Sequence, residues 1–282
     1  ETIFALTKAD QVIAFGDPAI AAPENFDTVA RANQDSHESD RPSVYELVES
    51  RFGHELISRS YRMNGQVLGR YLNQNFYDDE IILEPTVGQL FGEHNFEHFE
   101  VTEGANAEST IEGATESMDS EVEKVVELVI SHARWHPDES LMVVTASKSH
   151  ADRIDQRVSE AVREQPAIAE FFDAHGRERF ESVTMSELTH RLADRVIFSV
   201  GFGRTPEGRI SGTLGDFNSP GAGRWMVNQI VSARKRLSVV SCYNFEDFAG
   251  GSLPENQKWL KDLIAPSFLS DVLDGDPDPL LS

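Results

Sequence analysis

Arg62 is the residue whose type and setting could most directly do chemistry. It stands in the triplet Tyr61-Arg62-Met63, ahead of an apolar run at helical spacing and of three acids. Those acids are Asp78, Asp79 and Glu80. A guanidinium presents five donors in a planar fork that fits a carboxylate or a phosphate. Taken alone, these surroundings favour a salt bridge from Arg62 to one of the three acids.

Histidines occur twice at the i,i+4 spacing that lets two imidazoles on one helix face bind a metal. The pairs are His94/His98 and His132/His136. Neither pair has a third ligand at a fitting spacing, so we predict no metal site. Gly201-Phe202-Gly203 follows a predicted strand without opening a helix, which indicates a turn, and the sequence contains no nucleophile elbow.

The charge balance excludes some partners. The chain has 282 residues, with 25 Lys and Arg against 48 Asp and Glu, for a net charge of −23. Because affinity for nucleic acid comes largely from cations that neutralise phosphates, the isolated chain should bind DNA or RNA weakly. A lone cysteine, Cys242, excludes an internal disulfide and is expected to be a buried thiol. No apolar stretch is long enough to span a bilayer, so we expect a cytoplasmic protein without a membrane partner.

The elements that must position these residues follow from the apolar periodicity. Continuous or short apolar runs predict strands at residues 12–15, 56–57, 141–145, 182–184, 195–200 and 237–242. Helical spacing predicts helices at residues 43–52, 64–74, 120–135, 147–162, 226–235 and 255–264. Val44, Leu47 and Val48 should form the inward stripe of the first helix. Residues 93–118 are acidic and read as a long loop. Strand–helix alternation predicts an α/β fold with a mostly parallel sheet flanked by helices.

Several segments, taken in order, resemble a known family. They are residues 12–17 (VIAFGD), 61–77, 121–158, 194–203 (DRVIFSVGFG), 214–218 and 223–240. This order resembles the C-terminal, second RecA-like domain of superfamily 1 DNA/RNA helicases, of the bacterial AAA-type DNA helicase kind. The resemblance spans roughly residues 10–245 and implies a RecA-like fold of the P-loop NTPase type. It also implies that Arg62 is the catalytic arginine that reaches a nucleotide γ-phosphate, and that Gly16, Asp17 and Arg234 line the nucleotide site.

The chain departs from the family pattern at the motifs with which the family binds nucleotide. The Gly-rich phosphate loop and the Mg²⁺-holding acidic motif are absent from this sequence. Ile20, Leu192 and Ser232 stand where the family has a glutamine, an acid and an arginine. We therefore expect a catalytically degenerate domain that binds no cofactor in isolation. ATP and Mg²⁺ would be cofactors of a full-length parent, if that parent is active.

The resemblance also divides the chain. Residues 1–30 would end the first motor domain and form a linker, 31–245 would be the second RecA-like domain, and 246–282 a helix and acidic linker. We expect a piece of a larger protein, whose N-terminal motor domain is a partner and whose nucleic acid is DNA rather than RNA. Two alternatives remain open. The parent could be a competent hydrolase that uses unconventional residues, or the fold could act as a protein-interaction scaffold, docking through its acidic loop and tail.

Overall fold

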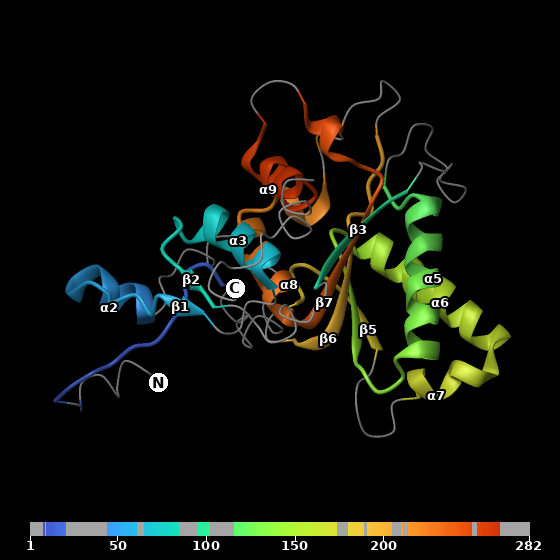
Figure 1. Ribbon diagram of the computed structural model, residues 1–282, viewed down its shortest axis with the longest axis horizontal. Helices are drawn as coiled ribbons and strands as arrows, with labels where there is room; N and C mark the ends of the chain where they lie inside the picture. The colour runs from blue at the N-terminus through green and yellow to red at the C-terminus, as the bar shows by residue number, and fades with distance from the viewer. Residues whose placement is uncertain are drawn as a thin grey trace, which may run out of the picture.

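The apolar run at residues 141–145 forms a fully buried strand, β4 (Leu141–Thr145), inside a five-stranded sheet. The strand order is β3-β7-β6-β4-β5 and every neighbouring pair is parallel (Figure 1). This computed structural model describes residues 8, 10–20, 44–60, 65–84, 95–101, 116–173, 180–188, 191–204, 210, 212, 214–249 and 253–265. The predicted fold class is confirmed: the protein is α/β, with a parallel sheet flanked by helices, consistent with a RecA-like fold.

The sheet is most deeply buried at its centre, where β4 lies beside β6 (Ala193–Ser199) and β6 lies beside β7 (Ala233–Ser241). The outer strands are β3 (Phe96–Glu100) and β5 (Phe180–Thr184). Alternate residues face opposite layers, as a strand requires. In β4, Met142 and Val144 enter one core cluster, while Leu141 and Val143 enter the other.

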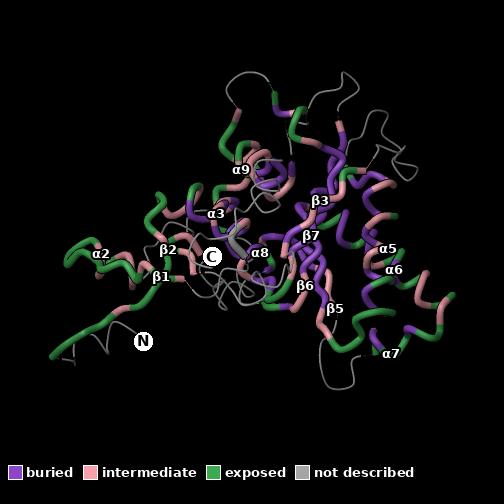
Figure 2. The backbone as a smooth tube through the Cα atoms, in the orientation of Figure 1, coloured by how far each residue is buried: buried purple, intermediate pink, exposed green. Residues whose placement is uncertain are grey.

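Helices cover both faces of the sheet (Figures 1 and 2). One face carries α5 (Asp119–Trp135), α6 (Lys148–Glu164), the 3-10 turn η3 (Pro166–Ile168) and α7 (Ala169–Phe172). The other carries α3 (Gly65–Phe76), η4 (Gly215–Asn218), α8 (Ala222–Ser232), η5 (Phe245–Phe248) and α9 (Glu255–Leu263). The predicted helices in α3, α5, α6 and α9 are confirmed. Leu260 and Leu263 of α9 are buried in the same core as α3 and α8.

The N-terminal elements lie apart from this core (Figure 1). Helix α2 (Val44–Phe52) contains no buried residue, so the prediction that Val44, Leu47 and Val48 face inward is wrong. Gly53 ends the helix as expected, with φ +73°, a conformation that glycine adopts without strain. Two short parallel strands follow, β1 (Arg59–Ser60) and β2 (Ile82–Leu83). The strand predicted at residues 56–57 is instead exposed and lies just before β1.

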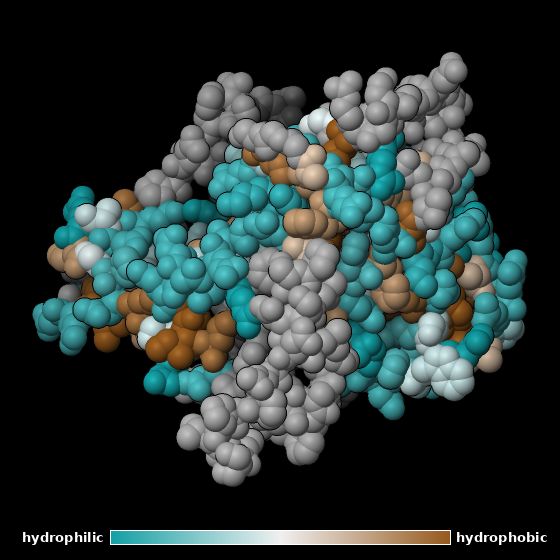
Figure 3. Space-filling model, turned by 45° about the horizontal axis from the view of Figure 1, so that its top comes forward, coloured by the Kyte–Doolittle hydropathy of each residue, from teal (hydrophilic) through white to brown (hydrophobic). Residues whose placement is uncertain are grey.

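The sequence predicts a buried strand at residues 12–15, and this prediction is wrong. They are extended but belong to no strand, and Ile13 and Phe15 are 71% and 80% exposed. A strand needs backbone partners on a neighbouring strand, and none of the strands in the described ranges pairs with this run. Apolar side chains also gather on the surface of this end of the molecule, which holds α2 and β1 (Figure 3). Its exposed apolar residues include Leu47, Phe52, Leu56 and Ile57.

Two boundaries within the sheet also need correction. Residues 96–100 lie inside the stretch predicted as an acidic loop at 93–118, but they form strand β3 along β7. Phe96 is buried there, and the acidic Glu97 is compensated by Arg236 and Ser238 of β7. The helix predicted to run to residue 235 ends at Ser232, because Ala233 already pairs with Ala193 of β6.

Candidate functional site

Asp17, one of the residues predicted to bind nucleotide, has a carboxylate that already accepts two hydrogen bonds within the chain. Its Oδ1 accepts the backbone N–H of Ala19 at 2.9 Å, and its Oδ2 accepts the hydroxyl of Tyr77 at 2.7 Å. Burial and the hydrogen bond to Asp17 raise the pKa of Tyr77 well above its usual value, so the hydroxyl keeps its proton. Ala19 and Ile20 then pack against the main core. Asp17 therefore anchors the 10–20 segment to the end of α3.

Of the other residues predicted to bind nucleotide, the structure describes Gly16 and Arg234. Gly16 packs on the ring of Tyr45 in α2, where an added Cβ would come within 2.6 Å of the ring. Arg62 lies outside the described residues. Arg234 is the second residue of β7 and is exposed at the amino-terminal edge of the sheet. Ser232 is buried at the end of α8, where the family resemblance places an arginine.

The carboxyl-terminal edge of the sheet contains a buried polar cluster that the sequence analysis missed. Glu121, in the first turn of α5, is completely buried. Its Oε2 accepts the hydroxyl of Ser199 at 2.8 Å and the backbone N–H of Gly201 at 2.7 Å. Its Oε1 accepts the backbone N–H of Cys242 at 3.0 Å. One carboxyl group thereby ties α5 to the ends of two neighbouring strands, β6 and β7.

His150 of α6 extends this cluster. Its Nε2 lies 2.8 Å from Ser199 Oγ and its Nδ1 lies 2.9 Å from Ser117 Oγ. Burial raises the pKa of Glu121 to about 7, although the hydrogen bonds from Gly201, Ser199 and Cys242 oppose the rise. Burial, with a smaller effect from the charge of Arg153, lowers the pKa of His150 to about 3. The imidazole is therefore neutral around pH 7.

A strained turn closes the cluster at its outer side. Ser117 has φ +56°, a left-handed conformation that is costly for a residue with a Cβ. Its N–H donates to the Gly201 carbonyl at 2.7 Å, and Arg153 donates to its carbonyl and pairs with Asp119. Gly201 has φ +77° and lies on the His150 ring, where an added Cβ would come within 2.6 Å. Neighbouring groups therefore hold the turn from several sides.

The same edge contains the switch point of the sheet. Helix α6 follows β4 onto one face and α8 follows β6 onto the other, and in open α/β sheets ligands bind in the crevice this creates. Here a turn of the chain packs on the residue that follows β4. Asp216 N–H donates to the Ala146 carbonyl at 2.7 Å. Gly215 has φ +57°, and an added Cβ would lie 2.0 Å from that carbonyl oxygen.

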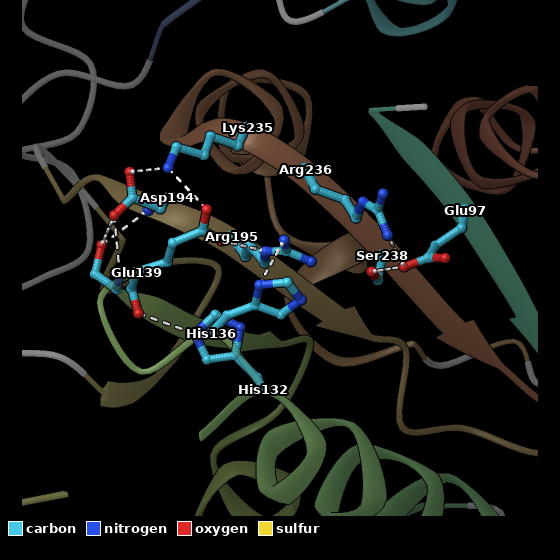
Figure 4. Close-up of polar contacts among 10 residues, drawn as sticks. Glu97, His132, His136, Glu139, Asp194, Arg195, Lys235, Arg236 and Ser238 are labelled. Atoms are coloured by element: carbon cyan, nitrogen blue, oxygen red, sulfur yellow. Dashed lines mark hydrogen bonds and ion pairs between the residues drawn. The ribbon is translucent and has the colours of Figure 1, made fainter. Parts of the chain in front are cut away.

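The amino-terminal edge carries a second, more exposed charge network (Figure 4). Glu139 pairs with Arg195 at 2.6 Å and with Lys235 at 2.8 Å, and Asp194 lies 3.9 Å from Lys235. Burial alone would raise the pKa of Glu139, but the hydrogen bonds from Lys235 and Arg195 outweigh it and lower the pKa to about 2. His136 Nδ1 lies 3.4 Å from Arg195. The positive charges of Arg195 and Lys235 are neutralised by Glu139 and Asp194. The network therefore links neighbouring strands and leaves little net positive charge to bind a phosphate.

Of the two histidine pairs considered in the sequence, His94 lies outside the described residues, and the other three histidines already have polar partners. His132 Nε2 lies 2.9 Å from the Glu139 carbonyl (Figure 4), and His98 Nε2 lies 2.9 Å from Ser241 Oγ. Burial lowers the pKa of both imidazoles. Within the described ranges no group of three His, Cys, Asp or Glu side chains could hold a metal ion. None of the helices described there is long and apolar enough to cross a bilayer.

Glu121 and His150 had a signal in the sequence. Each stands at helical spacing inside an apolar stripe, Glu121 four residues before Val125 and His150 four residues before Ile154. An ionisable residue on a buried helix face needs partners, which here come from strands far away in sequence.

Comparison with protein-family models and with curated proteins finds no match to the chain.

Proposed function

We propose that this chain is the C-terminal motor domain of an ATP-dependent DNA helicase-like protein and that it is catalytically degenerate. Within a longer protein it would supply one wall of a nucleotide cleft and one face of a DNA track. By itself it would neither bind ATP tightly nor hydrolyse it. The parallel sheet and the collinear sequence segments support the ancestry.

The turn that packs on the switch point is the observation that carries the proposed loss of activity. The turn at Gly215 and Asp216 packs on the Ala146 carbonyl at the carboxyl ends of β4 and β6. Beside it, Glu121, Ser199 and His150 satisfy one another rather than facing a ligand. A triphosphate placed at this edge would meet a buried acid.

The contacts of Asp17 support the same conclusion. A carboxylate at a nucleotide site typically holds Mg²⁺ or orients water through its free oxygens. Both oxygens of Asp17 already accept hydrogen bonds, from Ala19 and Tyr77. The loss of the glutamine at Ile20 removes a further contact, since Ile20 packs against the core instead.

An ATPase assay on the purified chain, with Arg62→Ala as the matched control, tests this function. We expect the same background rate of phosphate release from both proteins with Mg²⁺ and single-stranded DNA present. Hydrolysis that depends on Arg62 would show an active site and refute the proposal. In a longer protein containing a phosphate loop, Ser232→Arg separates the two remaining cases. A large gain in rate indicates degeneracy, and no change indicates an altered but working site.

A specific observation also favours the scaffold alternative. Phe52 and Ile57 are 82% and 72% exposed at the end of the molecule that holds α2 and β1 (Figure 3). Large apolar side chains grouped on a surface are typical of protein interfaces. If the fold is a scaffold, Phe52→Ser with Ile57→Ser should abolish binding to a partner co-purified with the longer protein. Trp135→Ser, which removes an apolar side chain that is 70% exposed elsewhere, should not. Equal binding by both variants would count against this surface.

A further inference from the structure

Four side chains at the carboxyl-terminal edge form an unbroken hydrogen-bonded line. It runs from Glu121 Oε2 to Ser199 Oγ at 2.8 Å, on to His150 Nε2 at 2.8 Å, and from His150 Nδ1 to Ser117 Oγ at 2.9 Å. Glu121, Ser199 and His150 are completely buried, whereas Ser117 retains a small exposed fraction of 7%. The line therefore leads from the interior to the strained turn that precedes α5.

Every member of this line can both donate and accept a hydrogen bond. A carboxylate only accepts, but a carboxylic acid also donates. A serine hydroxyl does both, and a neutral imidazole donates from one nitrogen and accepts at the other. Because neighbours must alternate, a proton on Glu121 Oε2 and its loss set opposite directions for every bond along the line.

We infer that Glu121, Ser199, His150 and Ser117 form a proton wire in which ionisation of Glu121 reverses every hydrogen bond and switches the tautomer of a neutral His150. With Glu121 protonated, its O–H donates to Ser199, Ser199 donates to His150 Nε2, and His150 Nδ1–H donates to Ser117. With Glu121 ionised, Ser117 donates to His150 Nδ1, His150 Nε2–H donates to Ser199, and Ser199 donates to Glu121.

The proton count balances along this path. The protonated line holds four mobile protons, one on each member. When one proton leaves to solvent from the Ser117 hydroxyl, the Nδ1 proton moves to Ser117. The Ser199 proton then moves to Nε2, and the Glu121 proton moves to Ser199. Three protons remain, and no bond between heavy atoms is made or broken.

The surroundings of the wire are consistent with this behaviour. Backbone N–H groups of Gly201 and Cys242 fix the Glu121 carboxyl in either state. Arg153 and Asp119 lie at the outer end and pair with one another. Arg153 Nη1 also lies 3.4 Å from Ser117 Oγ.

Other polar groups belong to the elements around the wire. The Cys242 thiol hydrogen-bonds Glu121 and lies 3.8 Å from Ser120 Oγ, and Glu116 contacts Ser149 of α6. The pKa of Glu121, raised by burial to about 7, places the switch near neutrality. The pKa of His150, lowered by burial to about 3, keeps the ring neutral throughout.

Nitrogen NMR of the ¹⁵N-histidine-labelled chain tests the wire, because the two ring nitrogens report protonation separately. His150→Gln identifies the signals of His150 by their loss. In the wild type between pH 5.5 and 8.5, we expect His150 to change from the Nδ1–H to the Nε2–H tautomer with a midpoint near 7, without passing through imidazolium. The other histidines provide internal controls in the same spectra.

Ser199→Ala provides the matched interruption, because it removes the one hydroxyl between Glu121 and His150. In this variant the tautomer of His150 should stay constant over the same pH range, while ¹³C NMR still detects the titration of Glu121. A single tautomer throughout the wild-type titration would overturn the wire, as would a cationic ring. Persistence of the switch in Ser199→Ala would overturn it as well. If Ser199→Ala does not fold, the wild-type titration alone decides.

Discussion

Glu121 and His150 should make the free energy of unfolding depend on pH in opposite directions, and the two effects should cancel in the wild type. Replacing one of the two residues should therefore expose the pH dependence that the other causes. The pKa of Glu121 is raised from 4.5 to about 7, so its contribution to stability is present below pH 4.5 and is lost as pH rises toward 7. The pKa of His150 is lowered from 6.5 to about 3, so its contribution is present above pH 6.5 and is lost as pH falls toward 3.

Between pH 4.5 and 6.5 the two effects run against each other. In the unfolded chain the glutamate is ionised and the histidine protonated, whereas in the folded protein both are neutral, so the pair binds one proton in each state. Each group alone changes the free energy of unfolding by about 1.4 kcal/mol per pH unit. Over this window each group is half-titrated at one end, so each single variant should depart from the wild type by about 2 kcal/mol.

The assay is urea unfolding at several pH values from 4.5 to 6.5, followed by tryptophan fluorescence. Relative to the wild type, Glu121→Gln should become less stable as pH falls, because His150 is then unopposed. His150→Gln should become less stable as pH rises, because Glu121 is then unopposed. A constant loss from repacking leaves these slopes unchanged. Parallel pH profiles for the three proteins would refute the reasoning, and so would slopes of the same sign.

Three further predictions concern single contacts. Gly215→Ala should lower the free energy of unfolding by about 2 kcal/mol or more, since its Cβ would meet the Ala146 carbonyl at a positive φ, whereas Gly212→Ala, with open space around it, should cost little in the same urea titration. Tyr77→Phe removes the hydrogen bond to Asp17, so the free energy of unfolding should fall by about 1 kcal/mol and proteolysis within residues 10–20 should accelerate. Unchanged proteolysis would contradict the anchoring role of Asp17. Glu139→Gln should lower Tm at neutral pH, and the loss should be smaller in 1 M NaCl. The loss should vanish as pH falls toward 2, because the lowered pKa of Glu139 means that its stabilisation is present above pH 4.5 and is lost below it. A loss of Tm that does not depend on salt would exclude the charge network as the cause.

The sequence predicted the central architecture because its signals there are local. Residues 141–145 are apolar without interruption, and the stripes at Val122, Val125 and Val129 define α5, so strand and helix follow from spacing alone. β3 was missed because an edge strand needs only one buried face, and Phe96 is its single buried residue. Its pairing with β7 is a contact between segments about 140 residues apart in the chain, as Glu97–Ser238 shows.

The candidate site was harder to predict for the same reason. Glu121, His150, Ser199 and Cys242 come from four elements, and only the folded sheet brings them together. The end of α8 could not be placed from periodicity, because Ala233 leaves the helix to pair with Ala193. The run at residues 12–15 has the composition of a buried strand, but burial depends on partners that local sequence does not specify.

Calorimetric titration of Mg²⁺–ATP into the purified chain tests the central claim most directly. Because the turn at Gly215 packs on the switch point and both oxygens of Asp17 accept hydrogen bonds within the chain, we predict no saturable binding at millimolar nucleotide. Saturable binding in the micromolar range, abolished by Arg62→Ala, would contradict the account.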